Sequence, residues 1–320
     1  MDKIDQFITE NKDKWLKELG EYVAIPSISR SGVYGSQSII EVANWLVEHF
    51  KKIGFKSELI KTPYDPLVFA EWKNPNNKFT LLIYSQADVQ PADPVEEWET
   101  SPFKLTVSDG KIFARGISDS KGHLFAYIKS IESYLKVFGE LPINIKFIID
   151  CDEETDEVAL PWFIKNNSEK LIADAVLIGA GNMVAPNTPS ICYGYRGILA
   201  AELEVKTLKI NLHSGTFGGG VLNATECLAN ILLNLRGEGN KISIPGFYDG
   251  VVSFVSEKPI YATAHYSEED FLKVAGANKI NRESEFSLDE CLAARPTFDI
   301  NGIYGGSSAE AFQYIIPAKA

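Results

Sequence analysis

Three segments of the 320-residue chain place acidic side chains where a site built on a sheet would gather them. They are "SQADVQPA" with Asp88, "ARGISDSKGH" with Asp119, and "FIIDCDEETDE" with Glu153 and Glu154 side by side. Because sites in open α/β sheets collect at the carboxyl ends of the strands, we expect these carboxylates to converge. In an adjacent pair, one carboxylate can coordinate a metal ion while the other takes a proton from a bound water.

The stretch "LLIYSQADVQPA" also places Gln86 two residues before Asp88, so both side chains point to the same side of the predicted strand. A metal site on a sheet would place a His-x-Asp pair at this position, and the chain has Gln in place of His. Three interpretations are open: a metal enzyme with one changed ligand, a former enzyme, or a strand end that never held metal.

The first half of the chain alternates helical and strand-like hydrophobic patterns. Helices are expected over residues 4–23 and in "SIIEVANWLVEHFKKIGF", "GHLFAYIKSIESYLKVFG" and "LPWFIKNN". Strands are expected in "LVFAEW", "FTLLIYS", "NIKFIID" and "ADAVLIG". This order predicts a three-layer α/β domain.

The pattern changes near Ser190. "ILAAELEVK" alternates like a strand with one solvent-facing side, and "GGGVLNATECLANILLNLRGEG" is typical of an amphipathic helix that begins at glycine. We therefore predict a second, α+β domain from about Tyr193. The terminal "YIIPAKA" has the pattern of a strand start, and ending there would leave a sheet edge unpaired.

Composition excludes several classes of partner. The net charge of -12 repels phosphate backbones, so nucleic acid is not expected to bind. The four cysteines form no C-x-x-C pair, and their scatter suggests a reducing, cytoplasmic setting. No apolar run is long enough to span a membrane, so a membrane partner is not expected either.

Further motifs follow in one order: Trp98 with "SPF", "DGKIFARGISDSKG", "DEE", "YGYRGILAAELEV", "LHSGTFGG" and "RPTFDINGI". Together they resemble the dinuclear-zinc metallopeptidases of the carnosinase, carboxypeptidase G, aminoacylase and succinyl-diaminopimelate desuccinylase family, with the carnosinase-like dipeptidase branch fitting best. The resemblance runs from "VAIPSIS" to "IIPAKA". It implies a zinc-peptidase-type catalytic domain in residues 1–192, followed by a lid, or dimerisation, domain in residues 193–320.

The resemblance also assigns roles to the acidic residues. Asp119 would bridge two zinc ions, and Glu154 would ligate the first of them. Glu153 would be the general base that activates a metal-held water for amide hydrolysis. Asp88 would be the carboxylate that orients the ligand at the strand end.

Two residues of the second domain receive roles in the same way. His213 would stabilise the tetrahedral oxyanion, in this family often across a dimer interface, although on spacing alone it is an ordinary loop histidine. Arg295 would bind a substrate carboxylate. The substrate would be a small peptide or an N-acyl amino acid, and the chain would form a homodimer through the lid. His49, near a predicted helix end, is expected only to stabilise that end.

The chain departs from the family pattern at positions that matter for metal. Gln86 stands where the family has histidine, and Ala180, the best match to an acidic ligand, has no donor atom. Both positions would serve only the second zinc. The histidine of the first zinc would lie in a C-terminal segment that this chain lacks, so both domains are expected to be incomplete there. At most one weak zinc site is therefore expected.

Three functional hypotheses follow. The first is a metal-dependent dipeptidase or carboxypeptidase whose hydrolase activity is impaired. The second is a catalytically inactive relative that acts as a binding or dimerisation module. The third is a fragment of a truncated gene, which would dissolve poorly because of the open sheet edge.

Overall fold

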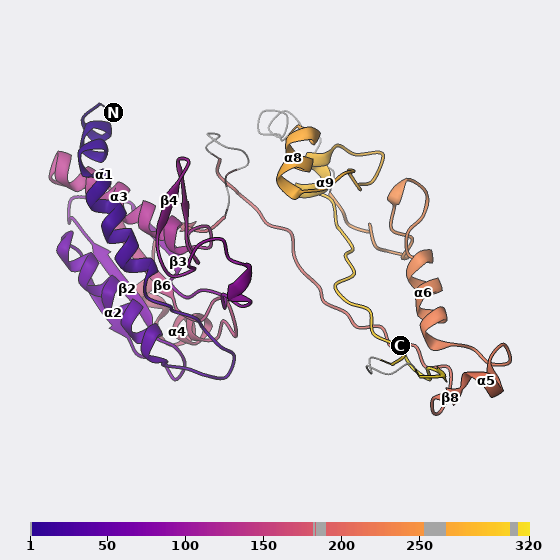
Figure 1. The fold of residues 1–320 in the computed structure, drawn as a ribbon. Helices are drawn as coiled ribbons and strands as arrows, with labels where there is room; N and C mark the ends of the chain where they lie inside the picture. The colour runs from indigo at the N-terminus through magenta and orange to yellow at the C-terminus, as the bar shows by residue number, and fades with distance from the viewer. Residues whose placement is uncertain (1, 182, 184–189, 253–266, 308–312) are drawn as a thin grey trace. The chain divides into compact units, whose positions relative to one another are not determined.

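The computed structural model describes residues 2–181, 183, 190–252, 267–307 and 313–320. The chain divides into two compact units, unit 1 (Met1–Asn182) and unit 2 (Met183–Ala320) (Figure 1). The unit boundary falls before the predicted domain boundary at 192/193. The assignment of the two parts as catalytic and lid domains stays a prediction. None of the helices in the described ranges has the length and apolar character that a bilayer crossing requires.

A five-stranded mixed sheet forms the centre of unit 1, with the order β1-β2-β6-β3-β7. Its strands are β1 (Lys56–Ile60), β2 (Leu67–Trp72), β3 (Thr80–Gln86), β6 (Asn144–Asp150) and β7 (Ala175–Ile178). Strands β6, β3 and β7 are parallel, whereas β1 and β2 add in antiparallel orientation. Gln86 pairs with Asp150 in register, so β3 and β6 deliver their following loops to the same edge of the sheet. A small hairpin of β4 (Thr106–Ser108) and β5 (Lys111–Phe113) stands apart from this sheet.

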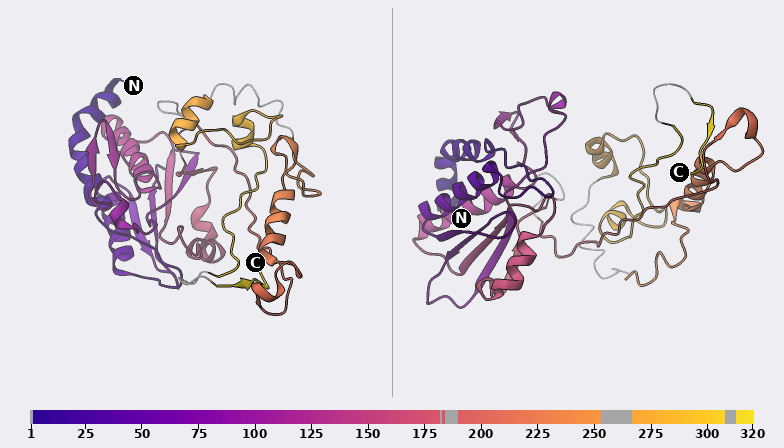
Figure 2. Two further views of the ribbon diagram at one scale, coloured as in Figure 1. Left: turned by 45° about the vertical axis from the view of Figure 1, so that its right-hand side comes forward. Right: turned by 90° about the horizontal axis from the view of Figure 1, so that it is seen from below.

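Helices cover both faces of the sheet (Figures 1 and 2). One face packs with α1 (Asp2–Val23), α2 (Gln37–Lys52) and α3 (Lys121–Phe138), and the other with α4 (Ala159–Asn167). The strands divide their side chains between two cores. In β2, Val68 and Ala70 enter the first core while Leu67 and Phe69 enter the second. The predicted three-layer α/β architecture is therefore confirmed, as are the predicted helices and strands of this unit.

Unit 2 has fewer regular elements. Its helices and strands are α5 (Ser214–Phe217), α6 (Ala224–Asn234), α8 (Glu268–Ala275), α9 (Leu288–Ala293), β8 (Leu212–His213) and β9 (Ile315–Ile316). The described residues also form short 3₁₀ turns. Val95–Glu97 and Ser168–Leu171 lie in unit 1, and Glu238–Asn240 lies in unit 2.

Three predictions for unit 2 are wrong in detail. The "ILAAELEVK" segment forms no strand ladder among the described residues, where only an isolated bridge joins Lys206 to Lys319. Helix α6 begins after Asn223, whose side chain accepts the backbone N–H groups of the first turn, and not at glycine. The terminal segment is paired, because β9 runs antiparallel to β8 and the Ala320 backbone bonds that of Val205 in both directions.

Candidate functional site

Asp88 is buried just beyond the end of β3 and holds two neighbouring segments in place. Its Oδ2 accepts hydrogen bonds from the Ser29 hydroxyl at 2.7 Å and from the backbone N–H of Glu154 at 2.9 Å. Burial raises the pKa of Asp88 to about 6, although both hydrogen bonds oppose this shift. Asp88 thus positions the backbone of Glu154 and does not itself reach solvent.

Two glutamine amides hold the Glu154 carboxylate. Gln86 Nε2 donates to Oε1 at 3.1 Å, and Gln90 Nε2 donates to Oε2 at 3.0 Å and to the Glu154 carbonyl at 2.8 Å. Each carboxylate oxygen therefore has an amide donor. We call this arrangement of Gln86, Gln90 and Glu154 the amide clamp.

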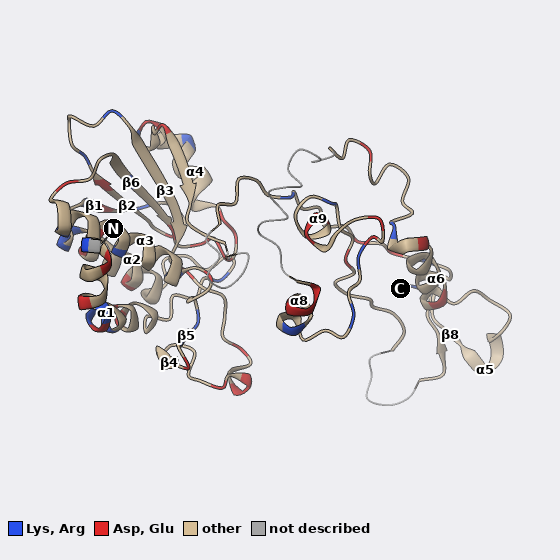
Figure 3. Ribbon diagram, turned by 90° about the horizontal axis from the view of Figure 1, so that it is seen from above, with Lys and Arg blue, Asp and Glu red and all other residues tan. Residues whose placement is uncertain are grey.

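The predicted acidic residues lie close enough to influence one another electrostatically. Burial, followed by the charges of Glu154, Asp88 and Asp119, raises the pKa of Glu153 to about 7. Burial and the nearby Asp119 and Asp88 likewise raise the pKa of Glu154. Figure 3 shows the acidic loops that follow β3 and β6 at one edge of the sheet. The charges of Asp88, Asp119 and Glu154 therefore act on Glu153.

The loop that carries Glu153 and Glu154 is tied to the segment that follows α1. Asp156 accepts hydrogen bonds from the Ser31 hydroxyl at 2.6 Å, and from the Gly32 N–H and the Tyr34 hydroxyl, both at 2.8 Å. Sequence reasoning missed these contacts, and it missed Gln90 and Ser29 as well. Gln90, Ser29 and Asp156 do lie in the quoted stretches "ADVQPA", "VAIPSIS" and "FIIDCDEETDE", but the sequence assigned them no role.

The donor set decides which metal complement the site can hold. Asp119 and Glu154 offer carboxylate oxygens, which suit one divalent cation. Gln86 has no imidazole, and its amide N–H donates to Glu154. Ala180, in the loop after β7, has no ligating atom. That this donor set holds one cation bound by oxygen, and not the pair of zinc ions that the resemblance implies, stays a prediction. The individual roles of the acidic residues stay predictions.

The other two predicted residues lie in unit 2. His213 ends β8, where its Nδ1 accepts the Gly215 N–H at 3.0 Å and its ring stacks on Tyr314 at 6.2 Å between centroids. Arg295 follows α9 and pairs with Glu283, with 2.9 Å between Nη2 and Oε2. Both residues belong to unit 2, whereas the predicted carboxylates belong to unit 1.

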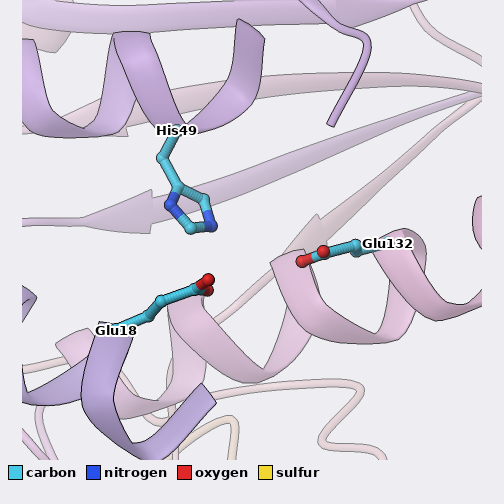
Figure 4. Close-up of side chains that lie close together, drawn as sticks. All are labelled: Glu18, His49 and Glu132. Atoms are coloured by element: carbon cyan, nitrogen blue, oxygen red, sulfur yellow. The ribbon is translucent and has the colours of Figure 1, made fainter. Parts of the chain in front are cut away.

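A different group of potential metal ligands lies in the helical layer of unit 1. Glu18, His49 and Glu132 place one ligand atom each within 4.8 Å of the others, and their side chains point toward one another (Figure 4). The Lys129 ammonium lies among them, 2.5 Å from Glu18, 2.6 Å from Glu132 and 3.0 Å from His49 Nε2. This group, the Lys129 cluster, thus already contains a cation.

The expectation for His49 is wrong. The imidazole is buried, stacks on Trp45 at 4.6 Å between centroids and contacts the Lys129 ammonium. Burial first, and then the Lys129 charge, lowers its pKa to about 4. A neutral imidazole cannot stabilise a helix end as a cation would, so His49 acts in the Lys129 cluster as a hydrogen-bond acceptor.

We expect His49 to make the protein less stable in acid. The folded-state pKa of about 4 lies below the ordinary value of 6.5, so the unfolded chain binds the proton more tightly. The free energy of unfolding should fall by about 2–3 kcal/mol as the pH drops from 6.5 to 4. His49→Gln keeps an acceptor for Lys129 but does not titrate. Chemical unfolding across this pH range should give a flatter profile for the variant, and parallel profiles would contradict the assignment.

Comparisons with known proteins identify the same family as the sequence motifs do. Residues 82–310 match the sequence model of "Peptidase family M20/M25/M40". The Cys-Gly metallodipeptidase dug1 of Schizosaccharomyces pombe is 32% identical over 334 residues, which include 100% of this chain and 70% of that protein. The human Beta-Ala-His dipeptidase is 29% identical over 334 residues, with 100% of this chain and 66% of that protein covered.

Two solved structures share the fold over most of the chain. An M20 family metallo-carboxypeptidase, Sso-CP2 from Sulfolobus solfataricus, superposes with a TM-score of 0.78 at 34% identity and covers 95% of this chain. Human carnosine dipeptidase 1 also gives a TM-score of 0.78, at 28% identity over 99% of this chain. This chain spans 69% and 70% of those two structures, as it spans 66–70% of the two relatives above.

Proposed function

This chain belongs to the peptidase family M20/M25/M40, and we propose that it is an impaired metal-dependent dipeptidase or carboxypeptidase that acts on small peptides. The observation that supports this proposal is the electrostatic influence of Asp119, Glu154 and the buried Asp88 on Glu153. The relatives named above include a Cys-Gly metallodipeptidase, a Beta-Ala-His dipeptidase and a metallo-carboxypeptidase, which favours the amide bond of a small peptide or an N-acyl amino acid as the substrate.

In this proposal each acidic residue has a separate task. Asp119 and Glu154 would hold one divalent cation, which would supply Lewis-acid polarisation of the scissile carbonyl. Glu153 accepts a proton from the attacking water at its carboxylate and passes it to the leaving amine. Asp88 fixes the Glu154 backbone and, through it, the direction of the neighbouring side chains.

The amide clamp supports the view that hydrolysis is impaired. The two amide donors occupy one lone pair on each oxygen of Glu154, so a cation that approaches from their side has to displace a hydrogen bond. The positions of Gln86 and Ala180 leave a second cation with no ligand of its own. The same observation favours the second candidate function, a catalytically inactive module that binds a partner or dimerises.

The proposal includes a homodimer formed through residues 193–320. Unit 2 exposes apolar side chains along the segment that was predicted to be a strand, where Ile198 is 99% and Leu199 92% exposed. Apolar side chains at such exposure are typical of a surface that another chain covers.

Metal analysis combined with peptide hydrolysis tests the proposal. We expect the purified full chain to hold at most about one divalent cation and to hydrolyse a dipeptide such as Cys-Gly slowly. Glu153→Gln should abolish that slow turnover, because the amide cannot accept the proton. Glu157→Gln, an exposed neighbour in the same loop, is the matched control and should retain turnover, because Glu157 contributes only its charge to the surroundings of Glu153.

Each outcome separates one part of the proposal from the others. About two zinc ions per chain would contradict the impaired site. Turnover that survives Glu153→Gln would show that Glu153 is not the base. Turnover that is absent from the wild type, even with added zinc or manganese, would favour the inactive module.

A further inference from the structure

Arg295 is unusually enclosed for an arginine of unit 2. Its guanidinium lies between two rings, 4.7 Å from the Tyr248 centroid and 4.0 Å from the Phe286 centroid. Only 15% of its side chain is exposed. Aromatic faces on both sides fix the plane of the guanidinium, so its donors point in set directions.

The edge of this guanidinium is only partly satisfied. Nη2 donates to Glu283 Oε2 at 2.9 Å, and the Glu283 side chain is 12% exposed. Nε is buried and has no hydrogen-bond partner. A carboxylate that binds an arginine side-on accepts from two nitrogens at once, so the Glu283 carboxylate fills half of a bidentate position.

Glu283 reaches this position because its loop is held independently. Arg282 Nη1 donates to the carbonyl of Glu283 at 3.2 Å and to that of Phe286, and the Ser284 N–H bonds the Gly239 carbonyl at 3.0 Å. Glu283 also lies near Tyr248, since burial and then the Glu283 charge raise the pKa of Tyr248. The Glu283 carboxylate could therefore leave Arg295 while remaining beside Tyr248.

We propose that Glu283 is an internal competitor for the carboxylate site of Arg295. Its side chain stands in for the carboxylate of a ligand, and a ligand carboxylate binds by displacing it and by satisfying both Nη2 and Nε. The identity of the ligand as a small peptide with a free C-terminal carboxylate rests on the proposed function. The carboxylate role of Arg295 comes from the same family pattern, whereas the position of Glu283 in that site rests on the contacts within unit 2.

Binding of a small carboxylate to the metal-free full chain tests this inference. The probe is N-acetylglycine, with N-acetylglycinamide as its uncharged counterpart, and the measurement is titration calorimetry. Glu283→Gln keeps a side-chain oxygen near Arg295 but removes the competing charge. We expect it to bind N-acetylglycine about tenfold more tightly than the wild type, or tighter still, and to gain nothing for the amide. Adding Arg295→Lys to this variant should remove the gain.

The second arginine–glutamate pair of unit 2 provides the matched control. Glu268 pairs with Arg282 at 3.2 Å and is 54% exposed, so Glu268→Gln removes an equal charge without opening the Arg295 site. It should bind the probe as the wild type does. Glu283→Asp, which keeps the charge but shortens the side chain, should also bind more tightly than the wild type. It replaces the amide variant if thermal unfolding shows that Glu283→Gln is not folded.

The results separate failure of this inference from failure of the proposed function. Equal affinity of the wild type and both Glu283 variants would overturn the competition and leave Arg295 as a carboxylate-binding residue. No binding by any folded variant would overturn both the competition and the carboxylate role of Arg295. Because no metal and no turnover are involved, neither result depends on whether the chain hydrolyses peptides.

Discussion

Lys129→Met should lower the free energy of unfolding of the protein by about 3–5 kcal/mol. The Lys129 side chain is 6% exposed and its ammonium lies between Glu18 and Glu132, whose side chains are 23% and 8% exposed. Removing it leaves two carboxylates close together in a poorly hydrated position with no cation. The cation also lies over Phe125, at 4.9 Å from the ring centroid, so the variant loses that attraction as well.

Chemical denaturation measures this loss, and two further variants identify its cause. Glu18→Gln and Glu132→Gln, added together to Lys129→Met, should recover most of the stability because no unpaired charge then remains. Lys51→Met breaks an exposed pair with Glu48, with side chains 50% and 64% exposed, and should cost less than about 1 kcal/mol. An equal fall in the free energy of unfolding in both lysine variants would show that burial does not determine how much the Lys129 cluster stabilises the protein.

The carboxylate site of unit 1 could be predicted because its residues follow strands in sequence. The apolar runs of β3 and β6 identify two strands, and parallel pairing then brings the residues beyond Gln86 and Asp150 to one edge. Short-range pattern and a general rule for sheets account for Asp88, Glu153 and Glu154, whereas Asp119 precedes α3 and does not follow a strand of this sheet. The hydrogen bonds of Gln90 and Ser29 depend on loop conformation, which no periodic pattern encodes.

The Lys129 cluster could not be predicted from the sequence. Its contacts join residues 111 and 80 positions apart, and each member also has the spacing of an ordinary charged residue on an amphipathic helix. Only the packing of α1 and α2 against α3 shows that these side chains share one buried position. His49 was misjudged for the same reason, since burial lowers its pKa and the sequence does not report burial.

The strand predicted in "ILAAELEVK" failed for a different reason. Alternation of apolar and polar residues identifies a segment able to form a strand, but a strand also needs a hydrogen-bonded neighbour. Among the described residues that neighbour exists only near the end of the segment, where Val205 and Thr207 bond Ala320 and Ala318. Pattern predicts the conformation of such a segment better than it predicts its pairing.

Gln86→His combined with Ala180→Asp should create a second metal position beside Asp119. The imidazole and the carboxylate are ligand types that zinc prefers, and losing the Gln86 amide also frees Oε1 of Glu154. We expect the zinc content to rise by about one ion per chain, as measured by elemental analysis after dialysis. Zinc at 100 times its dissociation constant should then raise the free energy of unfolding by about 2.7 kcal/mol.

Controls for this variant separate ligand chemistry from simple loosening of the amide clamp. Gln86→Ala with Ala180→Asp frees Oε1 of Glu154 without adding an imidazole, so it should gain less zinc than the histidine variant. Dipeptide hydrolysis should increase in the histidine variant and disappear when Glu153→Gln is added. If the histidine variant binds no more zinc than the wild type, then positions 86 and 180 do not face a common metal position. The changed residues at these positions would in that case not explain an impaired site.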